Sequence, residues 1–289
     1  PEHIRAVAEI LESTTIVSGS ATIAQKKEGI NYDATLSAAQ AMLRIAKTEG
    51  NGEGNFRFAA IANCPADIPF FPASYHRGRT CFMIALESGD LLARAMTATD
   101  DFASAKKKLT SILEKEYTKV EKIAKRVEKQ HGLCFRGIDT SPAPSILRNG
   151  SVALAIEKIA QGEFGAPGTL AICGMITDVL RSLRVRKCGF SGLMLPVMED
   201  FGLARRIGKL SIDALLVYSA VCGTGLDCVP LPGNIGVNRI RQILLDVATL
   251  ASRLNKPLSA RLLPIPGRCA GSVTKIDSPY LINCRIPHV

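Results

Sequence analysis

The chain has 289 residues, of which 47% are hydrophobic and 21% charged, and its formal net charge is +10 at pH 7. This is the composition of a soluble protein that is long enough to bury a large core. No apolar stretch reaches the ~20 residues of a membrane span, and no apolar segment follows the polar start, so we expect neither a membrane helix nor a signal peptide. The chain begins at Pro1 instead of Met, which indicates a fragment, a processed product or a trimmed chain.

Segments with the period of a strand alternate with segments of helical spacing along the chain. We expect strands over 14–24, 56–64, 80–88, 133–139, 188–197, 258–267 and 279–286. We expect helices over 33–48, with Asp33 as the N-cap, over two segments between 89 and 131, and over 152–161, 167–184, 199–208, 211–221 and 237–254. This alternation predicts an α/β fold with one domain over 1–289, in which a parallel barrel is surrounded by helices.

Nine cysteines are spread over the chain, and no two of them form a CxxC pair. Most have apolar neighbours, which is typical of reduced thiols that pack as small hydrophobic side chains. We therefore predict a cytoplasmic protein with no disulfide and with most thiols buried. The four histidines are scattered, whereas a structural zinc site usually needs closely spaced cysteines and histidines, so none is expected.

The segment 101–131 carries nine Lys or Arg and five Asp or Glu, a surplus of four positive charges. A basic helix of this kind is either a solvated surface or a contact for nucleic acid or membranes. Aromatic residues make up only 5% of the chain, Trp is absent, and no nucleic-acid-binding motif is present. We therefore expect no specific nucleic-acid partner and no membrane partner. The lysines expected on the solvated face are Lys106, Lys107, Lys108, Lys115 and Lys122.

The stretch "SAVCGTGLDCVPLPGN", Ser219 to Asn234, is predicted to form a loop before the last long helix. Gly223 and Gly225 let the backbone approach a ligand closely, and exposed amides here could hold an anion. Asp227 is the only carboxylate of this loop and could be a base or a metal ligand. Either flanking cysteine could be a nucleophile if a base lay beside it. The alternative is a tight turn whose aspartate binds backbone amides.

The segment "GEFGAPGTLA", residues 162–171, is a second candidate for anion binding. Pro167 suits the first turn of a helix, so the amides of Gly168 and Thr169 are expected to be free at a helix start. Many helices start in this way without binding a ligand, so a purely structural role is the alternative.

Polar side chains follow several predicted strands, where parallel α/β folds build their sites. His76, in the loop "FPASYHRGR", could be a general acid–base or an idle exposed histidine. Asp139 and Glu199 follow apolar strands and suit acid–base work or an oxygen-ligated divalent metal. Such carboxylates could equally cap the next helix, but Asp139 precedes "TSPAP" and cannot cap a helix immediately, which favours a functional role for it. We expect Asp227 to lie within reach of His76 or Asp139 at the mouth of the barrel.

Long motifs over nearly the whole chain carry a resemblance to a known family. They are "GINYDA", "FFPASYH", "ALESGDLL", "RGIDTSPAP", "GEFGAPGTLA", "CGFSGLMLPVMED", "SAVCGTGLDCVPLPG" and "LNKPLSARLLPIPG". Together they resemble an uncharacterised family, the domain of unknown function number seven hundred and eleven. The resemblance implies a pyruvate-formate-lyase-like α/β barrel of ten parallel strands, a fold shared with glycyl radical enzymes and anaerobic ribonucleotide reductases. Members have additional residues before the start of this chain, so we expect the first strands of the family domain to be missing here.

The resemblance implies no established reaction, and fold kinship alone argues weakly for one. Glycyl radical enzymes carry an Arg-(Val/Ile)-(Ser/Ala/Cys)-Gly-Tyr type of loop near the C-terminus. The segment "RCAGSV" agrees at Arg268, Ala270 and Gly271 but differs at Cys269 and Ser272. We therefore expect chemistry without a glycyl radical.

Two functions are compatible with these observations. The first is an enzyme that acts on a small anionic metabolite at the barrel mouth by acid–base or divalent-metal chemistry, its cofactor otherwise unknown. Its expected catalytic side chains are His76, Asp139, Glu199 and Asp227, and its expected binding backbone is that of Gly168, Thr169, Gly223 and Gly225. The alternative is a non-catalytic binding or assembly protein that uses 101–131 as its partner surface. A homo-oligomer is expected, and convergence of the four side chains in one pocket would favour the enzyme.

Overall fold

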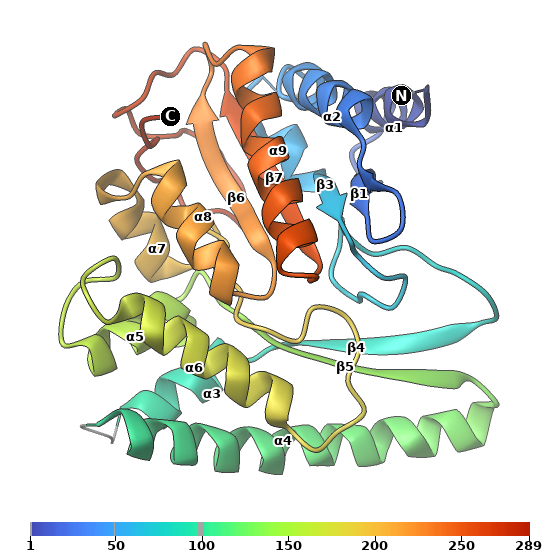
Figure 1. Ribbon diagram of the computed structural model, residues 1–289, viewed down its shortest axis with the longest axis vertical. Coiled ribbons are helices and arrows are strands. Elements are labelled where there is room, and N and C mark those ends of the chain that lie inside the picture. The colour runs from blue at the N-terminus through green and yellow to red at the C-terminus, as the bar shows by residue number, and fades with distance from the viewer. Residues whose placement is uncertain (1, 49, 98–100) are drawn as a thin grey trace.

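The computed structural model describes residues 2–48, 50–97 and 101–289 (Figure 1). The strands are β1 (Gly19–Gln25), β2 (Gly29–Ile30), β3 (Phe58–Ala62), β4 (Cys81–Glu87), β5 (Cys134–Ala143), β6 (Gly225–Pro232) and β7 (Leu258–Ile265). The helices are α1 (Glu2–Ser13), α2 (Tyr32–Ile45), α3 (Gly89–Met96), α4 (Phe102–His131), α5 (Val152–Ala160), α6 (Thr169–Ser182), α7 (Phe201–Arg206), α8 (Ile212–Val221) and α9 (Val237–Arg253). Short 3-10 helices are η1 (Glu53–Arg57), η2 (Arg148–Gly150) and η3 (Ile207–Lys209).

The larger sheet has five strands in the order β2-β1-β3-β7-β6. The pairs β1–β3 and β6–β7 are parallel, whereas β1–β2 and β3–β7 are antiparallel. Every residue of β3, β6 and β7 is buried, as expected for apolar strands that are covered on both faces. The helices α2 and α9 pack on each other and on this sheet, and one hydrophobic core joins them to it.

The smaller sheet consists of β4 and β5, which pair in parallel. In Figure 1 these two strands cross the molecule between the larger sheet and α4. A second hydrophobic core joins β5 to α3, α4, α5 and α6. Strand β5 also carries three consecutive buried polar residues, Asp139, Thr140 and Ser141.

The long basic helix α4 is confirmed. It begins after Asp101, whose side chain accepts hydrogen bonds from two backbone amides of the first turn, and it ends at Gly132, which has a positive φ. Its buried face includes Leu109, Leu113 and Tyr117. Of the five lysines expected on its solvated face, Lys108 is half-buried, and the other four are exposed: Lys106, Lys107, Lys115 and Lys122.

The expected closed barrel of ten parallel strands is wrong. The larger sheet is a curled half-barrel with two antiparallel pairs, and β4–β5 stands apart from it. The segment 188–197, predicted to be a strand, contains no named strand: one isolated bridge, Pro196↔Asp227, lies within it, and another, Ile138↔Lys187, lies just before it. Positive φ at Gly189 and Ser191 and the missing amide hydrogen of Pro196 prevent a continuous ladder in this segment.

Three local predictions also need correction. The motif at 219–234 contains the end of α8 and strand β6 instead of one continuous loop, because its apolar residues and prolines at 226–232 are buried beside β7. Asn31 caps α2 in place of Asp33, since its side chain reaches the amide of Ala34. The segment 279–286 is not a strand and makes only the isolated bridge Val273↔Arg285.

All nine cysteines are free. Four of them are buried, four are half-buried and Cys269 is exposed, so fewer thiols are buried than predicted. Among the described residues, no helix combines the length and apolarity that crossing a bilayer requires.

Candidate functional site

A cavity of about 100 Å³ lies where β6 and β7 meet the loops that follow β3 and β5. Its apolar walls are formed by Ala59, Phe70, Phe71, Pro72, Ala73, Ala143, Pro144, Phe190, Met194 and Pro196. The polar residues that line it are Glu199, Thr224, Asp227, Ser259 and Arg261. The polar groups therefore come from β6 and the residue before it, from β7, and from the end of the segment 188–200, and they line a largely apolar space.

A β-bulge in β6 brings two adjacent polar side chains to this place. The register between β6 and β7 shifts between Leu226 and Val229, so β6 carries one extra residue there. Cys228, inside the bulge, has a φ of 46°, in the left-handed region that residues other than glycine seldom adopt. A regular strand would send Asp227 and Cys228 to opposite faces. Here both reach Glu199, and ligand atoms of the three residues lie within 4.8 Å of one another.

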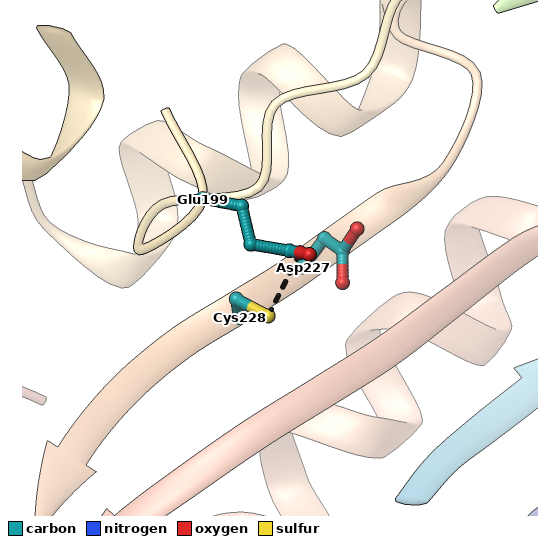
Figure 2. Close-up of side chains that lie close together, drawn as sticks. All are labelled: Glu199, Asp227 and Cys228. Carbon is teal, nitrogen blue, oxygen red and sulfur yellow. Dashed lines mark hydrogen bonds between the residues drawn. The ribbon is translucent and has the colours of Figure 1, made fainter. Parts of the chain in front are cut away.

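Figure 2 shows how these side chains meet: Glu199 comes from the loop before α7, whereas Asp227 and Cys228 come from β6. Arg261, on the neighbouring strand β7, joins the two carboxylates. Its Nε donates to Asp227 Oδ1 at 2.6 Å, and its Nη2 donates to Glu199 Oε2 in a short hydrogen bond. The Cys228 thiol donates to the same Glu199 oxygen at 3.0 Å. We call these four residues the Arg261 cluster.

The guanidinium of Arg261 is also in contact with Phe56. Its Nη1 donates to the carbonyl oxygen of Phe56 at 3.4 Å, and its central carbon lies 4.9 Å from the centre of the Phe56 ring. Each of its three nitrogens is therefore in a hydrogen bond, and the ring adds a cation–π contact. These contacts fix the guanidinium between the two carboxylates.

Burial controls the protonation of the cluster. The pKa of Glu199 is raised, chiefly because burial disfavours its charge and also because Asp227 repels it, although Arg261 opposes both effects. Burial likewise raises the pKa of the Cys228 thiol well above its usual value, against the attraction of Arg261. Cys228 is therefore a neutral donor at pH 7, and Glu199 accepts a proton more readily than an ordinary carboxylate.

Three oxygen atoms beside the cavity have no hydrogen bond within the described part of the chain. Thr224 is 1% exposed, and its Oγ1 is buried without a partner. The recorded hydrogen bonds of the two carboxylates engage only Oε2 of Glu199 and Oδ1 of Asp227, which leaves Glu199 Oε1 and Asp227 Oδ2 unpaired among these residues. Because a buried polar atom without a partner is costly, Thr224 Oγ1 indicates that the cavity receives a polar ligand or water, and the two carboxylate oxygens are free to accept from it.

A divalent cation fits this cluster poorly. Glu199, Asp227 and Cys228 offer three close ligand atoms, but Arg261 already binds both carboxylates. A metal ion would have to displace the guanidinium or sit against its positive charge. The carboxylates and the thiol are residue types that suit a metal, but here Arg261 already balances the charge of the carboxylates.

Only two of the four expected catalytic residues come together, since Glu199 and Asp227 share the cavity. His76 is exposed, and its ring nitrogen bonds to the Gly78 carbonyl oxygen at 2.7 Å. The cavity uses residues 70–73 of the same loop instead. The expected partner of Asp227 is also different, because its recorded hydrogen bond goes to Arg261 and not to His76 or Asp139.

Asp139 is fully buried and has a structural task. One of its oxygens accepts hydrogen bonds from the amide and hydroxyl of Ser141 and from the amide of Ser191, and the other accepts from the amide of Phe190. Burial raises its pKa, and these hydrogen bonds oppose the rise. Asp139 thereby holds the loop at 188–191, which carries Phe190 to the wall of the cavity.

The four expected anion-binding positions lie apart from the cavity lining. Gly168 and Thr169 start α6, where the Thr169 side chain accepts from the amide of Gly165 at 3.2 Å. Gly223 needs to be glycine because a Cβ there would lie 2.7 Å from the Cα of Gly192. Gly225, with a φ of 98°, packs against the backbone of Ser259. The close approach made by Gly223 and Gly225 is therefore to other backbone.

Sequence patterns missed Arg261 and Thr224. One signal for Arg261 was present, because it is the only charged residue inside the apolar run "LSARLLPI". A charge in a strand buried on both faces needs a partner, which pointed to a buried carboxylate. Thr224 carries no such signal, since a threonine beside glycines is equally typical of a turn.

Residues 1–277 match the family model described as Uncharacterised ACR (DUF711). The chain belongs to this family. It is similar to UPF0210 proteins from Pyrobaculum arsenaticum (31% identical over 290 residues, 96% of this chain) and Pyrobaculum islandicum (32% over 289 residues, 96% of this chain). A UPF0210 protein from Oenococcus oeni is 30% identical over 279 residues, 91% of this chain and 61% of that protein. The chain spans 63% of the length of each Pyrobaculum relative.

Proposed function

We propose that the protein is an enzyme that binds a small organic molecule in the cavity beside the Arg261 cluster and exchanges a proton with it through Glu199. The observation that carries the proposal is a half-buried carboxylate, Glu199, with a raised pKa beside a cavity whose polar lining is incompletely paired. Perturbed carboxylates in such cavities are typical of acid–base sites. The strained bulge at Cys228 supports the same reading, since such conformations gather at functional sites.

Each member of the cluster has a separate task in this function. Glu199 is the catalytic residue, because its Oε1 is unpaired while Oε2 is held by Arg261 and Cys228. Arg261 limits the rise of the Glu199 pKa and fixes the direction of the carboxyl group. Asp227 is a positioning residue that holds Arg261. The apolar walls keep water away from a bound molecule, which strengthens each polar contact.

The function is tested by turnover of a mixture of small metabolites, followed by mass spectrometry. We expect at least one compound to be converted by the native chain and its conversion to fall about 100-fold or more in Glu199→Gln, the usual size of a lost acid–base contribution. Glu163→Gln is the matched control, because Glu163 is an exposed carboxylate paired with Lys209 away from the cavity. Equal conversion by Glu199→Gln and the native chain would contradict the proposal.

The remaining expectations stay predictions. We infer a cytoplasmic location, which agrees with nine free cysteines, and a homo-oligomer without a specific nucleic-acid partner. Kinship with the pyruvate-formate-lyase-like superfamily also stays a prediction, because the family match does not extend to that superfamily. The activity of the whole protein is likewise a proposal, since the relatives are longer than this chain.

A further inference from the structure

We propose that the cavity beside the Arg261 cluster selects a small primary amine in its protonated form, with the ammonium group at Glu199, Asp227 and Thr224. This inference rests on the proposed function and names its class of substrate. Its starting point is the balance of charge around the cavity. Two carboxylates line the cavity, and Arg261 is the only basic residue among the described residues that line it. With both carboxylates ionised the cluster carries one negative charge in excess, which a monocation would neutralise.

An anion finds no free cation here. The guanidinium of Arg261 is already engaged by Asp227, Glu199 and the Phe56 carbonyl oxygen, so an incoming anion would face two carboxylates. The cavity therefore suits a cationic metabolite and not the expected anionic one. The excess of negative charge at the cavity contrasts with the protein as a whole, whose net charge is +10.

The number of unpaired oxygen atoms points to a primary ammonium. Glu199 Oε1, Asp227 Oδ2 and Thr224 Oγ1 have no hydrogen bond in the described part of the chain. A primary ammonium group has three N–H donors, as a lysine side chain does, and each of these oxygens can accept one. Thr224 is the independent observation, because its buried hydroxyl lines the cavity and has no partner of its own.

The rest of the cavity suits a short hydrocarbon chain. Phe70, Phe71, Phe190 and Met194 line it, and the phenyl rings can also attract a cation. A volume of about 100 Å³ admits only a short chain beside the ammonium group. The preferred ligand is therefore a compact alkylamine or the amino end of a larger molecule.

The inference is tested with propylamine, 1-propanol and propionate, added separately to protein labelled with ¹³C on its methionine methyl groups. Met194 lines the cavity and reports binding there, whereas Met96 and Met175 belong to the second core and serve as internal controls. At pH 7 we expect propylamine to shift the Met194 signal with a Kd at least about tenfold lower than that of 1-propanol, because charge-assisted hydrogen bonds are roughly twice as strong. Propionate should leave the signal unchanged.

Two variants test recognition, and the second also separates recognition from folding. Asp227→Asn keeps the shape of the side chain and removes the excess negative charge, so the preference for propylamine over 1-propanol should disappear. Thr224→Val keeps the shape and removes the hydroxyl, so propylamine should bind several-fold more weakly while the protein unfolds at the same or a higher urea concentration. The second result is expected because the hydroxyl has no partner to lose.

The amine assignment is overturned if 1-propanol or propionate binds as tightly as propylamine, or if no probe shifts Met194. Unchanged propylamine binding in Thr224→Val would remove Thr224 from the site. These failures are distinct from a failure of the proposed function, which is measured by turnover in Glu199→Gln. If the chain converts a compound without an amino group, and this conversion still depends on Glu199, the proposed enzyme function stands and the amine assignment is wrong.

Discussion

Arg261 and Asp227 form an ion pair inside the protein, with 2.6 Å between Nε and Oδ1 and only 7% of each side chain exposed. The two residues stand on the neighbouring strands β7 and β6. Glu199 completes the arrangement from a loop. A guanidinium buried with two carboxylates exchanges hydration for close partners, so removing one member leaves the others buried without compensation.

Arg261→Met should therefore destabilise the protein by about 3–5 kcal/mol, the usual cost of breaking a buried pair from one side. Urea unfolding followed by circular dichroism measures this free energy. Arg44→Met is the matched control, since Arg44 pairs with Glu12 at 2.6 Å but is 44% exposed. That control should cost about 1 kcal/mol or less. Similar costs for the two variants would show that the Arg261 cluster does not stabilise the fold.

The raised pKa of Glu199 predicts how its contribution to stability changes with pH. When the folded pKa lies above the unfolded value of about 4.3, the folded protein binds the proton more tightly. The contribution of Glu199 is then fully present below the unfolded pKa and is lost as pH rises through the folded pKa. The free energy of unfolding of the native chain minus that of Glu199→Gln should therefore fall between acidic and neutral pH. A difference that rises over this range would mean a lowered pKa.

Lys256 is buried and holds the end of α8. Its Nζ donates to the carbonyl oxygens of Ser219 at 3.0 Å and Ala220 at 3.2 Å, and in a short hydrogen bond to that of Cys222. Lys256→Met keeps the length of the side chain but leaves these carbonyls without their donor, which should cost about 1–3 kcal/mol. Lys209→Met, at a lysine that is 70% exposed, should change the unfolding free energy by about 0.5 kcal/mol or less. Equal effects would argue against a capping role for Lys256.

The outer face of α4 should bind nucleic acid only through charge. Lys106, Lys107, Lys115 and Lys122 are exposed on this helix. Any duplex DNA binding should be lost by ~0.2 M salt, because contacts with phosphates alone weaken steeply with ionic strength. Fluorescence anisotropy of a labelled duplex across a salt series measures this. Tight binding that persists at the higher salt, and that depends on base sequence, would show a specific partner.

Local patterns determined most of the helices and the buried strands. Helix α4 could be predicted because its apolar spacing, its N-cap Asp101 and its terminal Gly132 each act on residues only a few positions away. Strand β7 could be predicted because a continuous apolar run is typical of a strand covered on both faces. Family membership could be predicted as well from the long motifs, and the family match over residues 1–277 confirms it.

Only the tertiary structure decided that the sheet does not close into a barrel and which side chains make up the site. The apolar run at 188–197 satisfied the pattern of a strand, but its backbone at Gly189 and Ser191 turns away from a continuous ladder, and the sheet stays open. Arg261 meets Glu199 across 62 residues and Asp227 across 34. Such contacts depend on strand register and on the bulge at Cys228, and a one-residue change of register sends a side chain to the other face. Local propensity contains the period of a strand but not its register, so the sequence determined which segments are strands and helices, and packing determined which side chains meet.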